Sequence, residues 1–486
     1  MKVLVTGATG FIGRPLCLRL LGAGHTVRAL SRGPDRARGV LPTDVEIVGG
    51  SSRSGDGLVA AVDGTDGVIH LAGESIASGH WSRDTKARIR SSRVDLTRQL
   101  VSAIGDAAHP PSILVSGSAV GLYGSRGDEF LDEDSAAGEG FLADVARDWE
   151  AAAQAAEGQG LRVVRCRTGV VLGPDGGALP KMALPFRVGL GGPVGTGRQY
   201  VPWIHQDDMV EALLRCLEDP ELSGPVLAVA PQQATNRDLC EAIGAALGRP
   251  SWLPAPSLAL RVALGEAADL VLDSLRCTPT RLQERGFQFR FGSLEPALAD
   301  LLQPRGATFA PIQPADLPDH PYVARRKPRH RLTAADLVAA PVDEVFAFFS
   351  QPRNLGALSP AGLALSILGE VPAPMTVGST MRYGFSLGPV PLRWQAEVIR
   401  WEDQRGFTDI QHGGPYRSWW HEHDFEAVPG GTRVQDRVLF AAPLGPIGDL
   451  AGALAIEQTL ARIFDFRRRA LRWRFGEPAT SVRTAA

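Results

Sequence analysis

Short apolar runs alternate with amphipathic segments through the first part of the chain. Between the runs, apolar residues recur at helical spacing, as Ile12, Leu16 and Leu20 do. Continuously apolar strands that alternate with helices are typical of a parallel sheet covered by helices on both faces. We therefore predict a doubly wound α/β fold, whose strands include "KVLVT", "TVRALS", "GVIHLAG", "SILVSGS" and "LRVVRCR".

The pattern changes three times after these strands. Residues 1–172 form most of the predicted core. Residues 173–302 are richer in Gly and Pro, which predicts a small lobe that lies over the carboxyl ends of the core strands. Residues 303–330 combine several prolines with the basic cluster "ARRKPRHR", which predicts a stiff, extended linker. A solvated linker is favoured over a nucleic-acid site for this cluster.

A second domain is predicted over 331–476. "LTAADLVAAPVDEVFAFFS" fits a strand, a turn opened by proline and an amphipathic helix. Segments such as "LRWQAEVIRWE" and "TRVQDRVLFAA" alternate as half-buried strands do. A long helix with Leu460, Phe464 and Leu471 on one face follows, which completes a separate α+β domain. The last residues, 477–486, are predicted to be a disordered tail.

Composition narrows the possible partners. The net charge of -2 argues against a nucleic-acid partner, because phosphate binding needs a basic field. No apolar run is long enough to span a membrane, and the chain enters a strand at once, which leaves no room for a secretion signal. The five cysteines are scattered without a Cys-x-x-Cys pair, so we expect reduced thiols in a cytoplasmic protein. The oligomeric state stays open.

The stretch "TGATGFIG" directly follows the first strand and opens a helix. Glycines at this spacing permit a tight turn, close approach of a pyrophosphate and packing of the helix on the strand. A purely structural glycine turn is the alternative. We predict a Rossmann-type dinucleotide site, whose contacts in this turn are Gly7, Thr9, Gly10, Phe11, Ile12 and Gly13.

The end of the second strand, "LSRGPDRAR", indicates which dinucleotide binds. An acidic residue there would bind the ribose hydroxyls of NAD, whereas Arg32 beside Ser31 suits the 2′-phosphate of NADP. NADP is therefore the first choice and NAD the second. The alternative is a generic basic surface loop, since Arg28, Arg36 and Arg38 lie nearby.

Together these residues resemble the extended, epimerase-like branch of the short-chain dehydrogenase/reductase superfamily, and within it an atypical group of unassigned substrate. The resemblance covers about residues 1 to 302, including a C-terminal tail. It rests on "TGATGFIG", "HLAGESIASGHWSRDTKARIRSSRVDLT", "VSGSAVGLYG", "DWEAAA", "GGPVGTGRQYVPWIHQDD" and "LPAPSLALRVALGEAADLVLDSLRCTPTRLQERGF". It implies that Leu71, Ala72 and Gly73 lie along the cofactor.

The resemblance also implies a catalytic position at Ser118, with Ser116 as its neighbour, because a Ser or Thr there orients the substrate for hydride transfer. Serines after a strand are also common turn formers. The superfamily's Tyr and Lys, which move the proton and bind the ribose, are replaced by Leu142 and Ala146. Tyr123 is the candidate to move a proton instead.

"GTGRQYVPWIHQDD" resembles the segment that meets the far end of the substrate. Arg198 and Gln199 could bind an anionic or polar group there. His205, Asp207 and Asp208 begin a helix, with Asp as the cap, which we favour over a metal site.

The second domain resembles the helix-grip superfamily of START-like and polyketide cyclase-like domains. This implies a cavity for a hydrophobic ligand, although an ordinary core could use the same aromatic residues. His421 and His423 share a strand face, but sequence spacing offers no third ligand, so we predict no metal. The aromatic set is Trp394, Trp401, Tyr416, Trp419, Trp420 and Phe425.

Two functions fit this sequence. The first is an NAD(P)-dependent oxidoreductase or epimerase acting on a small carbonyl or alcohol, joined to a domain that binds a hydrophobic ligand. The second is a non-catalytic NADP(H) sensor or ligand carrier. Loss of the Tyr and Lys favours the second, and retention of Ser118, Arg198 and Gln199 favours the first. We predict the enzyme.

Overall fold

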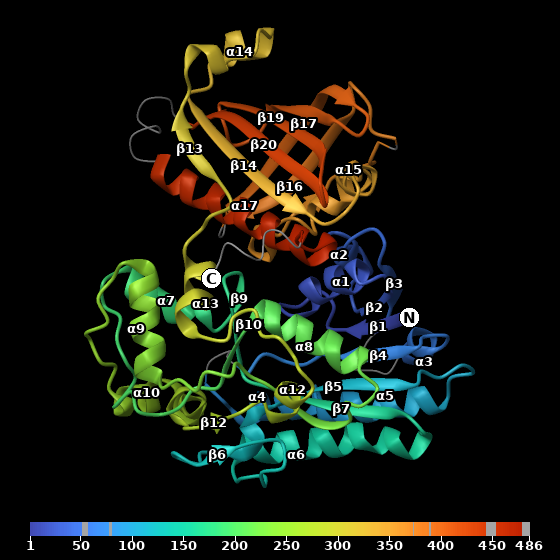
Figure 1. The fold of residues 1–486 in the computed structure, drawn as a ribbon, viewed down its shortest axis with the longest axis vertical. Helices are drawn as coiled ribbons and strands as arrows, with labels where there is room; N and C mark the ends of the chain where they lie inside the picture. Colours follow the sequence, from blue (N-terminus) through green and yellow to red (C-terminus); the bar gives the residue numbers. More distant parts are fainter. Residues whose placement is uncertain (51–56, 77–79, 373, 388–389, 444–452, 479–486) are drawn as a thin grey trace. The chain divides into compact units, whose positions relative to one another are not determined.

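The computed structural model describes the chain except for residues 51–56, 77–79, 373, 388–389, 444–452 and 479–486. The chain divides into two compact units (Figure 1). The first unit comprises Met1–Pro34 and Asp44–Gln303, and the second comprises Asp35–Thr43 and Pro304–Ala486. Most of the predicted tail, from 479 on, lies outside the described residues.

A seven-stranded parallel sheet forms the centre of the first unit, in the order β11-β7-β5-β4-β1-β2-β3. The strand order reverses between β1 and β4, which places a ligand crevice at their carboxyl ends in folds of this kind. The predicted doubly wound sheet is confirmed. Its strands are β1 (Lys2–Thr6), β2 (Thr26–Ser31), β3 (Glu46–Gly49), β4 (Gly67–His70), β5 (Ile113–Ala119), β7 (Arg162–Thr168) and β11 (Gly224–Ala228).

Helices cover both faces of this sheet because its strands are apolar on both sides. Leu4, Val68 and Leu114 point into one core with residues of α3 and α5, while the neighbouring Val3 and Val5 are buried on the other face. Figure 1 shows α1 and α8 on one side of the sheet, and α5 and α6 on the other. The bounds are α1 (Gly13–Gly22), α3 (Leu58–Val62), α4 (Arg83–Ser91), α5 (Val94–Gly105), α6 (Phe141–Gln154) and α8 (Gln206–Glu218).

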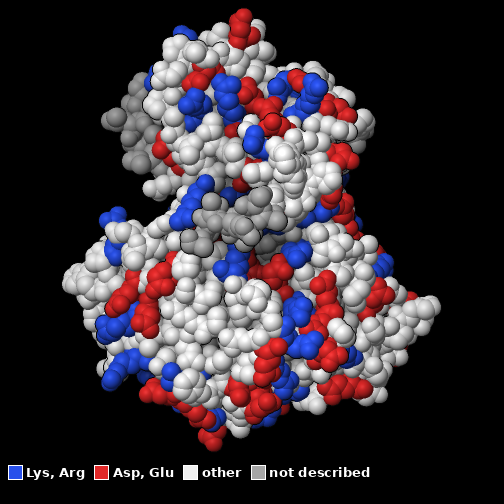
Figure 2. Space-filling view, in the orientation of Figure 1, with Lys and Arg blue, Asp and Glu red and all other residues white. Residues whose placement is uncertain are grey.

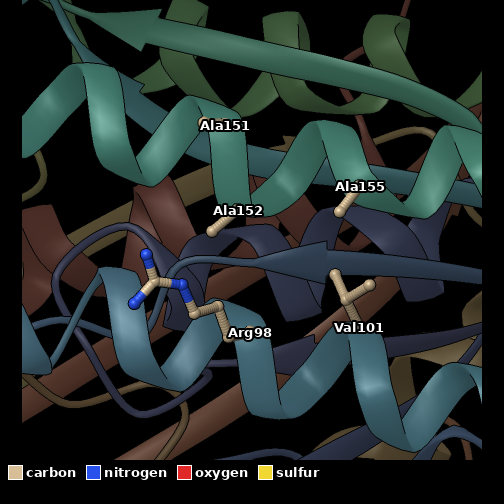
Figure 3. A pocket seen from close by; sticks show the side chains of 5 residues that line it. All are labelled: Arg98, Val101, Ala151, Ala152 and Ala155. Atoms are coloured by element: carbon tan, nitrogen blue, oxygen red, sulfur yellow. The ribbon is translucent and has the colours of Figure 1, made fainter.

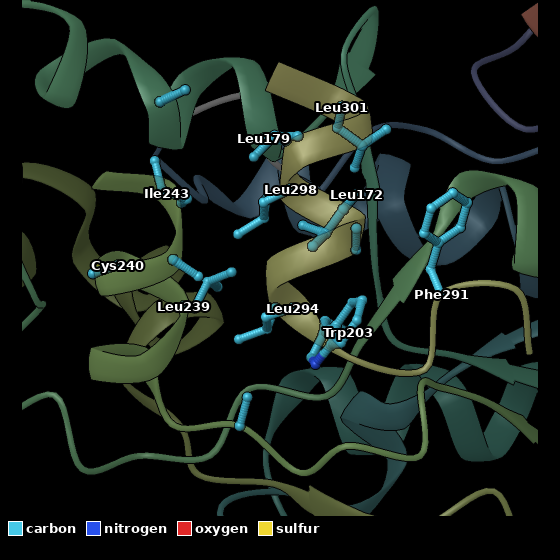
Figure 4. Close-up of a cluster of buried hydrophobic side chains, with 14 of the residues drawn as sticks. Leu172, Leu179, Trp203, Leu239, Cys240, Ile243, Phe291, Leu294, Leu298 and Leu301 are labelled. Atoms are coloured by element: carbon cyan, nitrogen blue, oxygen red, sulfur yellow. The ribbon is translucent and has the colours of Figure 1, made fainter. Parts of the chain in front are cut away.

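A smaller lobe of the first unit has its own apolar core (Figure 4). Trp203 and Leu172 from short strands meet Leu298 of α13 and Leu239 of α9 there. A capping box between Thr235 and Asp238 starts α9. The lobe and its surroundings contain β6 (Phe130–Leu131), β8 (Val170–Gly173), β9 (Gly176–Gly177), β10 (Trp203–His205), β12 (Arg276–Cys277), α7 (Leu179–Arg187), α9 (Asn236–Leu247), α10 (Ser257–Leu264), α11 (Asp269–Leu272), α12 (Thr280–Glu284) and α13 (Leu294–Leu302).

The second unit is built on an eight-stranded sheet with antiparallel neighbours, in the order β13-β14-β20-β19-β18-β17-β16-β15. Leu332, Trp419 and Phe440 on one face pack against Leu460 and Phe464 of the long helix α17. This is the predicted helix-grip arrangement. Its elements are β13 (Thr308–Pro311), β14 (His330–Val338), β15 (Ser366–Ile367), β16 (Thr380–Leu387), β17 (Val390–Glu402), β18 (Gly406–Gly413), β19 (Ser418–Val428), β20 (Gly431–Ala441), α14 (Pro321–Arg326), α15 (Val342–Phe349) and α17 (Ala453–Phe475).

The segment 303–330, predicted as a linker, instead contributes structure to the second unit. Thr308–Pro311 pairs with β14 as an edge strand, and Phe309 packs against the α17 core. Val323 of α14 is buried on the outer face of the sheet. Prolines fit here because an edge strand leaves some N–H groups unpaired.

The surface of the molecule carries mixed charges. On the face drawn in Figure 2, acidic and basic side chains are interspersed, in line with the small net charge. Among the described residues, no helix is both long and apolar enough to cross a membrane.

Candidate functional site

The glycine turn after β1 brings two backbone segments into close contact. Gly7 has a φ of 74°, and its carbonyl accepts a hydrogen bond of 2.9 Å from the Gly10 N–H. A Cβ at Gly7 would lie 2.9 Å from the carbonyl carbon of Leu71, and one at Gly13 would lie 2.2 Å from the Gly7 oxygen. Glycine is therefore required at both positions, and the segment Leu71–Gly73 lies against the turn.

The N-terminus of α1 opens beside this turn. Thr9 and Gly10 are exposed, and the first turn of this fully described helix contains no acidic side chain. The positive end of the helix dipole at this turn can therefore attract an anion such as a pyrophosphate. Ile12 is the N-cap residue and makes no capping bond through its side chain. The turn fits the predicted dinucleotide.

Phe11 connects the same turn to the small lobe. A Cβ at Gly173, Gly176 or Gly177 would lie within 3 Å of the Phe11 ring. The Phe11 carbonyl also accepts a 2.8 Å hydrogen bond from Gln206. These contacts give Phe11 a structural role beside the predicted cofactor position.

Arg32 follows β2, which pairs with β1 at the edge where the glycine turn lies. The side chain is exposed and has no hydrogen bond or ion pair within the described part of the chain. Arg28, by contrast, donates to Glu46 and to the backbone carbonyl of Asp63. The amide of Gly33 donates to Ser31 Oγ at 3.2 Å. Arg32 is thus an exposed arginine that could bind a phosphate group.

The serines at the end of β5 have different surroundings. Ser116 is fully buried, and its hydroxyl donates to the Gly117 carbonyl at 3.1 Å. Ser118 Oγ donates to Glu150 Oε1 at 2.6 Å. Glu150 also accepts hydrogen bonds from Arg167 Nε at 2.8 Å and Nη2 at 3.0 Å. Burial lowers the pKa of Arg167, but the bonds and the charge of Glu150 outweigh it, so the pKa lies above its usual value.

Tyr123 is held at the other end of this network. Its hydroxyl donates to the Asp132 carbonyl at 2.7 Å and accepts from Arg167 Nη1 at 2.7 Å. Burial raises the pKa of Tyr123 above its usual range, although Arg167 acts in the opposite direction. Tyr123 is fully buried, so this geometry keeps the proton on the hydroxyl and away from solvent.

One face of α6 runs along the end of β5. A Cβ at Gly121, just after β5, would lie 3.3 Å from Leu142 Cβ. Ala146 is buried one turn later, and Glu150 follows after another turn and contacts Ser118. Leu142 and Ala146 thus lie on the face that meets the end of β5, as the resemblance implies for the missing Tyr and Lys.

A basic side chain that the sequence did not single out lies beside the predicted cofactor segment. The Arg93 guanidinium carbon would be 3.4 Å from a Cβ at Gly73, and it lies 5.4 Å from the centroid of the Trp149 ring. Burial lowers the pKa of Arg93 to about 10, although the nearby charge of Glu74 acts to raise it. The guanidinium therefore stays charged at neutral pH. Glu150, Arg167 and Arg93 were all missed. Of these three residues, only Glu150 has a signal in the sequence, because it lies one helical turn after Ala146 and so on the same face of the helix.

A pocket of about 390 Å³ contains the predicted Arg198 and Gln199. Arg198 shares its wall with Arg261 and Ser257. Gln199 is engaged, because its side-chain nitrogen donates to the carbonyls of Val194 and Val271 at 3.1 and 3.0 Å. The pocket can therefore receive a polar or anionic group through Arg198.

His205, and not an Asp, caps α8. Its Nδ1 accepts from the Asp207 N–H at 3.0 Å. Asp208 instead accepts from the backbone amides of Arg290 and Phe291. A cap role for this segment is therefore found, but on a different residue.

Another hollow, of about 250 Å³, lies between α5 and the end of α6 (Figure 3). Figure 3 shows Arg98 and Val101 of α5 facing Ala152 and Ala155 across the gap. Arg98 is the one polar side chain of its lining. The hollow brings together none of the predicted site residues.

The aromatic residues of the second unit divide between the two faces of the sheet. Trp394, Tyr416 and Trp419 cluster with ring centroids 4.8 to 5.7 Å apart, on the face toward α17. Trp401 and Phe425 surround Phe346 on α15. Trp420 was expected with them, but it packs with Val323 on the opposite face, because neighbouring strand residues point to opposite sides.

Comparison with known proteins agrees with this architecture. The NAD dependent epimerase/dehydratase family matches residues 3–230, a domain of unknown function (DUF1731) matches 255–301, and the family "polyketide cyclase / dehydrase and lipid transport" matches 329–476. The epimerase family protein SDR39U1 homolog of Arabidopsis thaliana, named chloroplastic, is 39% identical over 313 residues, which are 62% of this chain and 87% of that protein.

Animal relatives cover the same part of the chain. The epimerase family protein SDR39U1 of Mus musculus is 40% identical over 306 residues, covering 62% of this chain and all of that protein. The crystal structure of human SDR39U1 with NADPH is 36% identical, covers 62% of this chain and 99% of its own, and has a TM-score of 0.57. This chain therefore belongs to the epimerase family that includes SDR39U1, and it carries a polyketide cyclase-type domain after the epimerase part.

Proposed function

We propose that the first unit is an NADP(H)-dependent oxidoreductase acting on a small carbonyl or alcohol. The observation that carries this proposal is the glycine turn, where Gly7 and Gly13 have no room for a Cβ and Arg32 stands exposed at the next strand. The NADPH in the structure of human SDR39U1 supports the choice of cofactor. NADPH would supply a hydride when bound, and water would supply the proton that converts the reduced carbonyl into the alcohol.

Ser118 would orient the substrate as a hydrogen-bond acceptor. Because its own proton points to Glu150, its free lone pairs can receive a substrate hydroxyl. Arg167 holds the Glu150 carboxyl group with two hydrogen bonds and so maintains this direction of the hydrogen bond. The half-buried charge of Arg93 beside Gly73 would replace the positive charge of the missing Lys.

The substrate would carry a polar or anionic group. Arg198 has no side-chain partner among the described residues and faces the pocket that Arg261 also lines. A guanidinium in such a position can bind a carboxylate or phosphate through two parallel hydrogen bonds.

A non-catalytic NADP(H) sensor is the second candidate. It is favoured by Leu142 and Ala146 on the α6 face at the end of β5, and by Tyr123, whose hydroxyl already has both its partners. In this case the first unit would bind the cofactor without turnover.

For the second unit we infer a hydrophobic ligand, supported by the aromatic cluster under α17 and by the family's description as lipid transport. We also infer a cytoplasmic protein. Its five cysteines are all free and buried, as a reducing compartment requires.

NADPH oxidation over a panel of small ketones, aldehydes and their carboxylated forms tests the proposal. We expect the wild type to turn over at least one compound, and Ser118→Ala to lower kcat by about 10²-fold, the cost of a misplaced substrate. Ser112→Ala, before the other end of β5, is the matched control.

The variant Leu142→Tyr with Ala146→Lys separates the two candidates. If only this variant reduces the compounds while both proteins bind NADPH, the sensor function replaces the enzyme. If neither protein turns over any compound, hydride transfer to small carbonyls is excluded as the function.

A further inference from the structure

Four polar side chains form a compact cluster on the face of the second unit that meets α17. Asp409 of β18 lies directly opposite His421 of β19, and Asp436 of β20 lies directly opposite His423. The two imidazole centroids are 3.8 Å apart. Strand pairing thus supplies the third ligand that sequence spacing did not reveal near the histidines.

Each imidazole presents one nitrogen to each carboxylate. Asp436 Oδ1 lies 3.0 Å from His421 Nε2 and 2.9 Å from His423 Nδ1. Asp409 Oδ2 lies 4.0 Å from His421 Nδ1 and 3.2 Å from His423 Nε2. A carboxylate only accepts hydrogen bonds, so His421 Nε2 donates to Asp436 and His423 Nε2 donates to Asp409, while His423 Nδ1 lies 3.2 Å from the donor Arg467 Nη2. This tautomer leaves a lone pair on His421 Nδ1 on the side of Asp409, and a metal ion at His423 Nε2 would displace the proton that Asp409 accepts.

The two carboxylates differ in how their charge is balanced. Arg467 Nη2 lies 3.0 Å from Asp436 Oδ1, so this buried aspartate already has a cationic partner. Among the described residues, no Lys or Arg pairs with Asp409, whose ionic contacts are the two histidines. The net negative charge of the cluster is therefore on the side of Asp409.

We propose that Asp409, His421 and His423 bind a divalent transition-metal ion. One ligand atom from each lies within 4.8 Å of the others. Metal–nitrogen and metal–oxygen bonds of about 2.0–2.2 Å place neighbouring ligand atoms about 3.3 Å apart in a tetrahedral site, so the widest separation shortens by about 1.5 Å, or under about 1 Å for each of two side chains. Two histidines and one carboxylate leave coordination positions open, as in sites for Fe²⁺ or catalytic Zn²⁺.

The surroundings match such a site. Asp436 accepts the Nε2–H of His421, the contact that fixes the tautomer of a metal-bound imidazole, and its Oδ1 lies 2.9 Å from His423 Nδ1. Phe407 stacks on His423 at 4.2 Å and gives an apolar wall. The side chains of Asp409, His421 and His423 are 15%, 10% and 9% exposed, which leaves access for an ion. This site is independent of the function proposed for the first unit.

Calorimetric titration of the full chain, stripped with EDTA and free of any affinity tag, tests the proposal with Zn²⁺, and visible absorption tests it with Co²⁺. We expect one ion per chain for the wild type. Asp436→Asn should weaken metal binding by about 10–100-fold. Asp409→Asn and His421→Phe each remove a proposed ligand and should weaken binding more than that, and the Phe keeps a ring in the stack. His412→Gln, on the same strand as Asp409 but paired with Glu397, is the matched control and should bind as the wild type does.

A wild-type chain that binds neither ion overturns the proposal. Binding that Asp409→Asn and His421→Phe leave unchanged, or that His412→Gln weakens equally, also overturns it, because the ion then lies elsewhere. Thermal melts without metal identify a variant that fails to fold. In that case the remaining folded variant decides the question together with the Co²⁺ spectrum of the wild type. The bands of that spectrum must report nitrogen and oxygen ligands.

Discussion

The buried contact between Glu150 and Arg167 predicts a large loss of stability in Glu150→Gln. The two side chains are 7% and 8% exposed, and two hydrogen bonds of 2.8 and 3.0 Å join them. Breaking a buried pair costs about 3–5 kcal/mol, because the remaining charge stays away from water. Arg167 keeps its bonds to Tyr123 and to the Glu133 carbonyl, so we expect about 3 kcal/mol.

Scanning calorimetry of the full chain measures this loss. The transition of the first unit is identified as the one that NADPH shifts upward. At about 2 °C per kcal/mol for a domain of this size, Glu150→Gln should lower its Tm by about 6 °C. Asp144→Asn is the matched control on α6, because its pair with Arg147 is exposed and contributes under about 1 kcal/mol. A Tm for Glu150→Gln equal to that of the control would refute the reasoning.

Two further predictions concern stability. Burial lowers the pKa of His70 in the folded protein to about 4. The contribution of the neutral imidazole to the free energy of unfolding is therefore fully present above the unfolded pKa of about 6.5 and is lost as the pH falls toward 4. Between about pH 7 and pH 5 the wild type should lose about 2 kcal/mol more than His70→Asn in denaturant titrations, and equal losses would contradict this. The fragment 304–486 should melt cooperatively and at a higher temperature than 331–486, because β13 and α14 contribute Phe309 and Val323 to its cores. Equal melting temperatures would show that these elements do not stabilise the unit.

The parallel sheet and the glycine turn could be predicted because each leaves a local signal. A buried strand between two helical layers is apolar on both sides, and the turn at Gly7 and Gly13 tolerates no side chain. Both signals are visible within a few residues of sequence.

The errors arose where the structure depends on distant partners. The strand β13 lies among prolines and is defined only by its pairing with β14. Glu150 and Arg167 come from a helix and a strand, and no local pattern marks a buried ion pair between them. Asp409 and His421 are joined by strand register, which sequence spacing does not give.

Titration with NADPH and NADH tests the central claim most directly, namely that the first unit is an NADP(H) site with Arg32 at the 2′-phosphate. The wild type should prefer NADPH. Arg32→Ala should lose about 1.5–3 kcal/mol toward NADPH, or about 10–150-fold in affinity, and keep its affinity for NADH. Arg36→Ala, a neighbouring exposed arginine, should change neither affinity. Equal affinity of the wild type for both cofactors, or no binding of either, would contradict the account.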